Sequence, residues 1–364
     1  MILPVKLRKN VDDSYDIHIT TDLFQQIGAD LRTNPIGDQY AIITDSNVKQ
    51  LYGNTLLSEL EANQLSTHLL HFPAGEASKT ISIYQQLLQK LIHSGLTRSS
   101  VIIALGGGVV GDIAGFLAAT YMRGIPYIQI PTTLLAQVDS SIGGKTALNL
   151  PEGKNLLGAF YQPKRVYIDP SLLLTLSTRQ FHNGLAEIIK HGVIFDFTLF
   201  QYIETHIPEI QAHDIVTLIH LIYHSCKIKA NIIQQDEREQ NIRVILNYGH
   251  TLAHALEQIE KYTLFHGEAV AIGMNYAGKL AVTKGFWRQS EYERQQRLLK
   301  AFNLPSHYAQ NNEQLISLMH RDKKGEQEQI MFVLPMTIGK MMSINGDYKI
   351  PIPEEELKAT LLTY

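Results

Sequence analysis

The sequence predicts an α/β domain built on a parallel sheet, followed by a mainly α-helical domain. With 364 residues, and roughly 100–200 residues per domain, the chain is long enough for two domains. In the first part, short apolar runs rich in β-branched residues alternate with helical patterns. Beyond about Leu172 the strand pattern almost disappears. We therefore expect one domain at residues 1–172 and a second at residues 173–364.

Four apolar runs in the first part predict buried parallel strands. They are residues 40–44 (YAIIT), 101–105 (VIIAL), 127–130 (YIQI) and 166–168 (VYI). Nearly continuous apolar runs are typical of strands that are covered on both faces. Between the first two runs, apolar residues from Ile81 to Leu91 repeat at intervals of three and four, which predicts a helix that ends near Gly95. Ligands of such open sheets bind beyond the carboxyl ends of the strands.

The second part carries three apolar stripes with helical spacing. They run from Leu185 to Val193, from Leu252 to Ile259 and from Val270 to Ala281. One short run, residues 331–334 (MFVL), predicts a late strand. The second domain is therefore expected to be mostly helical.

The composition excludes several classes of protein. Lys and Arg total 32 against 35 Asp and Glu, so no basic excess draws the chain to nucleic acid or to an acidic membrane. A single cysteine, Cys226, excludes an internal disulfide framework and Cys-rich zinc motifs. The first residues (MILPVKLRKNVDD) lack the apolar core of a secretory signal, and no apolar run approaches the roughly 18 residues of a spanning helix. We expect a cytoplasmic protein that binds neither nucleic acid nor membrane.

A glycine-rich motif follows the second predicted strand. Residues 106–112 (GGGVVGD) match the G-x-G-x-x-G spacing, which lets backbone N–H groups at a helix start approach a pyrophosphate. A tight turn before a helix of small residues would give the same pattern. The acidic residue expected about 20 positions downstream is missing. Asp45, directly after the strand 40–44, is a substitute acceptor for ribose hydroxyls.

Ionisable residues of the second part suggest a metal site. His250 and His254 are four positions apart and share one helix face, His266 precedes another helix, and Glu187 lies on the first stripe. Three nitrogen or carboxylate ligands plus water form a catalytic zinc site. A chain with 15 histidines also contains such a pair by chance. The spacing leaves open whether His250 or His254 is the ligand.

Lysines beside glycines form a third group of candidates. Residues 139–145 (DSSIGGK) and 153–155 (GKN) predict loops that suit phosphate. Lys190 lies one helical step from Glu187, and three further polar residues precede His250, namely Lys229, Arg243 and Asn247. A single lysine usually belongs to a solvated face. Together, beside glycines and candidate metal ligands, these residues predict a site for an anionic ligand.

In this order along the chain, the motifs resemble those of the 3-dehydroquinate synthase family. The matching stretches are PAGEASKT (73–80), ALGGGVVGDIAGFLAATYMRG (104–124), IPTTLLAQVDSSIGGKTALN (130–149), GKNLLGAFYQP (153–163), GLAEIIKHG (184–192), DERE (236–239), LNYGHTLAHALE (246–257), FHGEAVAIGM (265–274) and RDKK (321–324). The resemblance implies a Rossmann-like NAD-binding domain, a helical metal- and substrate-binding domain, and an active site in the cleft between them.

The resemblance also implies the reaction. The substrate would be the sugar phosphate 3-deoxy-D-arabino-heptulosonate 7-phosphate, and the products would be 3-dehydroquinate and phosphate, in the shikimate pathway to aromatic amino acids. NAD would be reduced transiently, phosphate would leave by β-elimination, and re-reduction with intramolecular aldol closure would complete the ring. A divalent metal, zinc or cobalt, would act as a Lewis acid on the oxidised hydroxyl.

The resemblance assigns roles residue by residue. The metal ligands would be Glu187, His250 and His266. The NAD contacts would be Asp45, Asn47, Ala74, Gly75, Glu76, Ala77, Ser78, Lys79, Gly107, Gly108, Val109, Val110, Gly111, Asp112, Thr132, Thr133, Lys145, Lys154, Leu172, Leu173, Leu174 and Thr175. The catalytic and substrate contacts would be Arg123, Asp139, Lys145, Asn155, Lys190, Lys229, Glu239, Arg243, Asn247, His254 and one of Lys323 and Lys324. Arg123 would reach the phosphate in the neighbouring subunit, which implies a homodimer.

Two departures from the family pattern concern single residues. Gln240, Asn241 and Ile242 precede Arg243 where a glycine is common, and we expect Asn241 to adopt the left-handed conformation of that turn. His191 stands where tyrosine is common.

Two other functions are alternatives to the synthase interpretation. The first is a metal-dependent NAD alcohol dehydrogenase of the glycerol dehydrogenase type, which has no use for a phosphate site. The basic residues beside glycines therefore favour the synthase. The second is a non-catalytic binding protein, which is disfavoured because every expected ligand position is filled.

Overall fold

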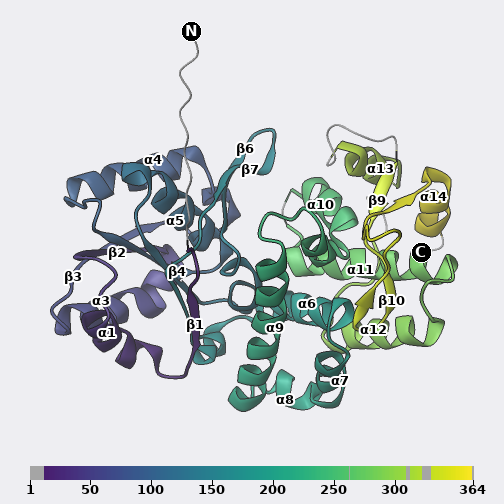
Figure 1. Cartoon of the computed structure of the whole chain (residues 1–364), viewed down its shortest axis with the longest axis horizontal. Coiled ribbons are helices and arrows are strands. Elements are labelled where there is room, and N and C mark those ends of the chain that lie inside the picture. Colours follow the sequence, from purple (N-terminus) through teal and green to yellow (C-terminus); the bar gives the residue numbers. More distant parts are fainter. Residues whose placement is uncertain (1–11, 262, 309–311, 322–328, 363–364) are drawn as a thin grey trace, which may run out of the picture.

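The computed structural model describes residues 12–261, 263–308, 312–321 and 329–362. Figure 1 shows a sheet-containing half formed by the first part of the chain beside a mainly helical half formed by the second. The predicted fold class is confirmed. In the described part of the chain, no helix combines the length and apolar character that crossing a bilayer requires.

The main sheet of the described residues has six parallel strands in the order β1-β8-β5-β4-β2-β3. Their bounds are β1 (Asp16–Ile19), β2 (Gln39–Asp45), β3 (Ser66–Phe72), β4 (Val101–Gly106), β5 (Tyr127–Pro131) and β8 (Arg165–Ile168). The four predicted strands are confirmed as β2, β4, β5 and β8. The edge strands β1 and β3 were not predicted, because half-exposed edges carry polar residues and break the apolar runs.

Helices cover both faces of the sheet. One face packs on α1 (Leu23–Thr33) and α3 (Asn54–Ala62), and the other on α4 (Ile81–His93) and α5 (Gly108–Thr120). Alternate strand residues serve the two faces, so Ile42 joins the first core and Ile43 the second. Short helical segments complete this half: α2 (Ser46–Val48), η1 (Lys49–Gly53), η2 (Glu76–Ser78), η3 (Tyr121–Arg123), η4 (Ala136–Ser140) and η5 (Pro170–Thr175).

An antiparallel hairpin projects from this half (Figure 1). It consists of β6 (Lys145–Leu150) and β7 (Gly153–Phe160). The prediction of a loop at residues 153–155 is wrong, because these residues begin β7. Leu148 and Leu157 pack into the same apolar core as α5, so burial outweighs the local glycine preference for a turn.

The helical half contains the three predicted helices as α6 (Thr178–Ile194), α10 (His250–Ile259) and α11 (His266–Thr283). The other segments are α7 (Phe197–Thr205), α8 (Ile207–Gln211), α9 (Ile215–Gln235), η6 (Ile242–Asn247), α12 (Gln289–Ala301), α13 (Asn312–Arg321) and α14 (Glu354–Leu362). The predicted domain boundary falls inside η5, between the last strand of the sheet and α6, and it stays a prediction.

The single late strand predicted at residues 331–334 is only partly right. Two small antiparallel pairs occupy this region: β9 (Ile330–Phe332) with β12 (Ile350–Ile352), and β10 (Pro335–Thr337) with β11 (Lys340–Met341). Strands of two or three residues are too short to leave a periodic pattern in the sequence.

Two helices of the second half approach each other at backbone distance. Gly249, the residue before α10, has φ +81°, and a Cβ built on Gly273 of α11 would lie 1.9 Å from the carbonyl oxygen of Gly249. Only glycine fits at Gly273 without movement of one backbone. This contact places the start of α10, with His250, beside α11.

We predict that Gly273→Ala lowers the free energy of unfolding by about 1–3 kcal/mol, because the added methyl group must push α10 away from α11. The measurement is urea unfolding followed by circular dichroism. Thr283→Ala, an exposed change at the end of the same helix, is the control and should alter stability by no more than about 0.5 kcal/mol. Equal stability of the two variants would contradict the close approach.

Candidate active site

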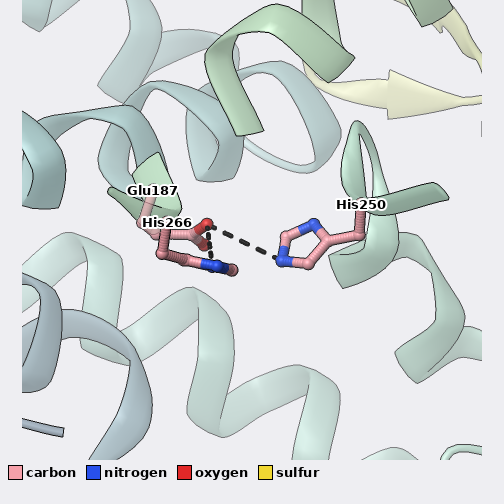
Figure 2. Close-up of side chains that lie close together, drawn as sticks. All are labelled: Glu187, His250 and His266. Carbon is pink, nitrogen blue, oxygen red and sulfur yellow. Dashed lines mark ion pairs between the residues drawn. The ribbon is translucent and has the colours of Figure 1, made fainter. Parts of the chain in front are cut away.

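Three side chains from separate helices converge in the helical half. Glu187 comes from α6, His250 is the first residue of α10, and His266 is the first residue of α11. Each offers one ligand atom, and these atoms all lie within 4.8 Å of one another. The Oε1 atom of Glu187 lies 3.5 Å from Nε2 of His266 and 3.9 Å from Nε2 of His250. Figure 2 shows both imidazoles turning a nitrogen toward the carboxylate.

The surroundings of these three residues fit a divalent metal ion. Glu187 is fully buried, and neither of its carboxylate oxygens accepts a hydrogen bond, although Lys190 forms an ion pair with it. A buried carboxylate without hydrogen-bond donors is costly unless a cation compensates it. Nδ1 of His250 donates to the carbonyl oxygen of Tyr248 at 3.2 Å, which leaves the lone pair of Nε2 facing Glu187.

The charges of the three residues follow from burial and from their neighbours. Burial raises the pKa of Glu187, but Lys190 and the two imidazoles outweigh burial and bring this pKa well below its ordinary value. Burial, helped by the charge of Lys190, lowers the pKa of His250 well below its ordinary value. Burial also acts to lower the pKa of His266, but the neighbouring carboxylates of Glu187 and Glu257 outweigh burial and raise that pKa to about 10. A metal at this position would displace the proton on Nε2 of His266.

The geometry distinguishes between the two histidines of α10. The ring of His254 packs edge-on against that of His250, with 5.5 Å between the ring centroids. Among the described residues, the group of close ligand atoms contains His250 and not His254. The candidate metal site is therefore formed by residues of three helices and not by the pair His250 and His254, which are four positions apart on α10.

Three of the predicted phosphate-binding cations are buried, and each has an oxygen partner inside the protein. Lys190 is 1% exposed and Lys229 is 6% exposed, and Nζ of Lys229 donates to the backbone and carboxylate oxygens of Asp139 at 2.6 and 2.5 Å. Arg243 is 2% exposed and donates to the carbonyl oxygen of Gly143 at 3.3 Å. A solvated face does not explain these three cations.

Glu239 connects two further predicted residues. Its carboxylate accepts hydrogen bonds from Nζ of Lys145, on the hairpin, and from the side-chain amide of Asn247, in η6. Burial raises the pKa of Glu239, but Lys145 and Asn247 outweigh burial and lower it. The side chain of Lys145 is 53% exposed, so this cation is accessible at the edge of the buried group.

The expectation for Asn241 is wrong. Asn241 has φ −146°, and the left-handed residue of this turn is Glu239, with φ 60°. The carboxylate of Asp236 accepts the backbone N–H groups of Gln240, Asn241 and Arg243 at 2.9, 2.7 and 3.1 Å. These three hydrogen bonds fix the turn, and its left-handed residue is two positions earlier in the sequence than expected. The turn directs Glu239 toward Lys145 and Asn247.

The predicted NAD segments lie along one edge of the main sheet. Asp45 ends β2, residues 74–79 follow β3, residues 107–112 follow β4, residues 132–133 follow β5, and residues 172–175 lie shortly after β8. Because the strands are parallel, their carboxyl ends meet at this edge. Strand order reverses between β2 and β4, and Asp45 and Gly107 flank that point. Such a reversal is where open α/β sheets bind ligands.

Several of these residues also hold the edge together. Asp45 caps α2 by accepting the N–H groups of Asn47 and Val48 at 2.8 and 2.9 Å. Nζ of Lys79 is buried between the carboxylate of Asp112 and Oδ1 of Asn155, and the latter distance is 2.5 Å. Lys79 thereby connects the loop after β3 with α5 and with the hairpin.

One predicted substrate contact, Arg123, lies away from this group. Arg123 is exposed on η3, at the far end of α5 and hence near the amino edge of the sheet, with φ 70°. Within the described residues it forms no hydrogen bond or ion pair with the other predicted substrate contacts of its own chain. Lys323 and Lys324 lie outside the described residues.

Glu257 is a site residue that the sequence reasoning missed. It is buried on α10, accepts a hydrogen bond from Nζ of Lys154 at 3.0 Å, and has Oε1 3.6 Å from Nδ1 of His266. Its spacing of seven residues, two helical turns, from His250 was a signal that it shares a face with that histidine.

A second group of close ligand atoms shares Glu187 and adds Asp139 and His191. Lys190 and Lys229 already pair with its two carboxylates, so a second cation is not required there. Nδ1 of His191 lies 2.5 Å from Oγ of Ser225, and burial with the nearby Lys190 lowers the pKa of His191 to about 3. His191 is therefore neutral.

The chain matches two family models in sequence. The model for the 3-dehydroquinate synthase N-terminal region matches residues 69–183, and the model for the C-terminal region matches residues 184–325. A 3-dehydroquinate synthase from Thermoanaerobacter sp. (strain X514) is 48% identical over 350 residues, which cover 96% of this chain and 97% of that protein.

Two solved structures with the same fold hold NAD+ and a divalent metal ion. The 2-epi-5-epi-valiolone synthase of Streptomyces hygroscopicus subsp. jinggangensis 5008, with NAD+ and Zn2+ bound, has a TM-score of 0.89 at 28% identity and covers 99% of each chain. A 2-deoxy-scyllo-inosose synthase complexed with carbaglucose-6-phosphate, NAD+ and Co2+ has a TM-score of 0.87 at 27% identity, over 95% of this chain and 96% of that one. A probable glycerol dehydrogenase from Sinorhizobium meliloti 1021, at 13% identity and a TM-score of 0.67 over 95% of each chain, shares the fold alone.

We predict that His250→Ala abolishes stoichiometric zinc binding and that His254→Ala preserves it, because His250 belongs to the described group of close ligand atoms around Glu187 and His254 does not. Metal content after dialysis is measured by mass spectrometry, with circular dichroism as the test of folding. A folded His254→Ala protein that loses its metal would contradict the three-helix site and favour the pair on α10.

Proposed function

The chain belongs to the 3-dehydroquinate synthase family, and we propose that it converts 3-deoxy-D-arabino-heptulosonate 7-phosphate to 3-dehydroquinate and phosphate. This activity is a step of the shikimate pathway, and its chemical class is a phosphate-eliminating carbon–oxygen lyase. The observation that carries the proposal is the contact between Lys190, a buried cation suited to phosphate, and Glu187 of the candidate metal site. Metal and phosphate ligands are thus neighbours.

The residues for both cofactors fit. NAD would be held by the segments at the carboxyl edge of the sheet, and zinc or cobalt by Glu187, His250 and His266. When bound, NAD accepts and returns a hydride and the metal ion acts as a Lewis acid on the reacting hydroxyl. The cofactors of the solved relatives support this assignment.

The cationic side chains would bind and stabilise the phosphate that leaves. Lys190 and Arg243 are buried, so their attraction to a phosphate dianion is weakly screened by water. Lys145 and Asn155 approach from the hairpin. The leaving phosphate itself takes up the proton from the adjacent carbon, so this step requires no separate protein base.

The remaining predicted contacts would position the sugar. Asp139 and Glu239 carry carboxylates that can accept hydrogen bonds from hydroxyl groups, and in this structure they pair with Lys229 and Lys145. Substrate would be bound by exchanging such internal partners for hydroxyl groups and phosphate. Asn247, the last residue of η6, and His254, within α10, complete the group.

We also propose that the enzyme is a cytoplasmic homodimer in which Arg123 serves the partner's site. The support is the place of Arg123, exposed on a turn away from the other predicted substrate contacts of its own chain. Met122 and Arg123 both have positive φ, which costs energy for residues other than glycine. A role at a second subunit gives a reason to retain this strained turn.

Simple oxidation of an alcohol by NAD is the competing function. A dehydrogenase of the glycerol dehydrogenase type shares the sheet and helices, but it needs no group of buried cations. Lys190 and Lys229 would then serve only to pair with Glu187 and Asp139, and the buried charge of Arg243 would have no ligand to bind. The proposal of phosphate elimination accounts for them.

We predict that Arg243→Ala lowers kcat/KM by about 10- to 100-fold, since a charge-assisted hydrogen bond contributes about 1.5–3 kcal/mol. NAD affinity, measured by calorimetry, should stay nearly unchanged. The control is Lys164→Ala, which removes a surface lysine paired with Asp13. Loss of NAD binding with intact substrate binding would instead assign Arg243 to the cofactor site.

The competing functions differ in their electron balance. We predict one phosphate released per substrate consumed, while NADH never exceeds the enzyme concentration, because the hydride returns to the product. Phosphate is measured by a coupled assay and NADH by absorbance in the same sample. An analogue with a non-leaving phosphonate should stall with at most one reduced cofactor per site. Sustained NADH production in step with turnover would contradict the synthase and support the dehydrogenase.

A further inference from the structure

Glu257 is a buried carboxylate for which the proposed reaction has no role so far. It lies in the third turn of α10 and is 5% exposed. Its Oε1 atom lies 3.0 Å from Nζ of Lys154 and 3.6 Å from Nδ1 of His266. A buried carboxylate needs such partners, and both partners belong to residues predicted to bind a cofactor.

The contact with His266 orients a metal ligand. Nε2 of His266 faces Glu187 and Nδ1 faces Glu257, so the ring is held between two carboxylates. A carboxylate that accepts the Nδ1 proton fixes both the tautomer and the plane of the ring, and it makes Nε2 a stronger electron donor. Glu257 therefore acts on the metal site without being a ligand.

The contact with Lys154 reaches into the other half of the molecule. Lys154 lies on β7 of the hairpin, and its Nζ is also 3.8 Å from Oε1 of Glu76, in the segment after β3. Glu76 in turn accepts a hydrogen bond from the side-chain amide of Asn149 of β6 at 2.7 Å. A continuous polar chain thus runs from the NAD edge of the sheet through Lys154 and Glu257 to His266.

We propose that Glu257 is a positioning residue that couples the metal site to the β6–β7 hairpin, by fixing the ring of His266 with the same carboxylate that holds Lys154. The inference rests on the metal site of the proposed function. If Glu257 has this role, the zinc affinity of the metal site depends on Lys154, a residue of the NAD-binding half. Lys154 influences the metal through Glu257, and removal of Glu257 disconnects the two.

The test measures zinc affinity of the full-length protein by competition with a chromophoric chelator. Glu257→Leu should weaken zinc binding by about 10- to 100-fold, and Glu257→Gln, which keeps an acceptor oxygen but not the charge, by about tenfold or less. The visible spectrum of the cobalt-loaded protein should change in both variants, because the donor strength of His266 changes. Glu260→Gln is the matched control, because Glu260 directly follows α10 and contacts Thr263 and Tyr308.

A double-mutant cycle tests the coupling. Lys154→Met should change zinc affinity when Glu257 is present and leave it unchanged in the Glu257→Leu protein. If the effects of the two substitutions on zinc affinity are additive, the coupling is overturned. If Glu257→Leu keeps the wild-type zinc affinity and an unaltered cobalt spectrum, the positioning role is overturned. If Glu257→Leu does not fold, an unaltered affinity and spectrum in Glu257→Gln overturn it. Failure of the wild-type protein to bind zinc or cobalt would instead contradict the proposed function itself.

Discussion

The charge of Glu187, fully buried on α6, is the constraint on which the centre of the molecule depends. Removing a carboxylate from water is expensive, and the protein compensates it with Lys190 on the same helix and with the charged imidazole of His266 on α11, while His250 of α10 turns a nitrogen to the same carboxylate. These partners must stay within a few ångströms, so α6, α10 and α11 have little freedom to move independently. The need to compensate one charge thus fixes the arrangement of three helices.

The backbone supports this arrangement at Gly249 and Gly273. Because the two glycines let α10 start against α11, His250 and His266 can both be first residues of their helices and still reach the same carboxylate. The sheet contributes in a different way, by bringing segments distant in sequence to its carboxyl edge. Lys154 and Glu257 then link the edge of the sheet to the helical site.

The sequence predicted the central strands and the main helices because their burial leaves clear periodic patterns. It missed β1 and β3, whose exposed sides carry polar residues, and the hairpin, whose glycines favoured a loop. Spacing alone left His250 and His254 as alternatives, since the decisive partner, Glu187, is distant in sequence. The family resemblance supplied the ligand set that the structure brings together. Asn241 and Glu257 depended on contacts with Asp236, His266 and Lys154, which no local pattern records.

One apolar core crosses from the sheet into the helical half. Val166 and Ile168 of β8, with Leu134 and Val138 beyond β5, pack in the same cluster as the buried residues of α6, α9 and α11. Cutting the chain at the junction would expose this surface on both pieces. The two halves are therefore poor candidates for exchange between proteins as separate modules. We expect proteins with this fold to acquire new functions by changes in the side chains that line the junction, while the packing between the two halves stays the same.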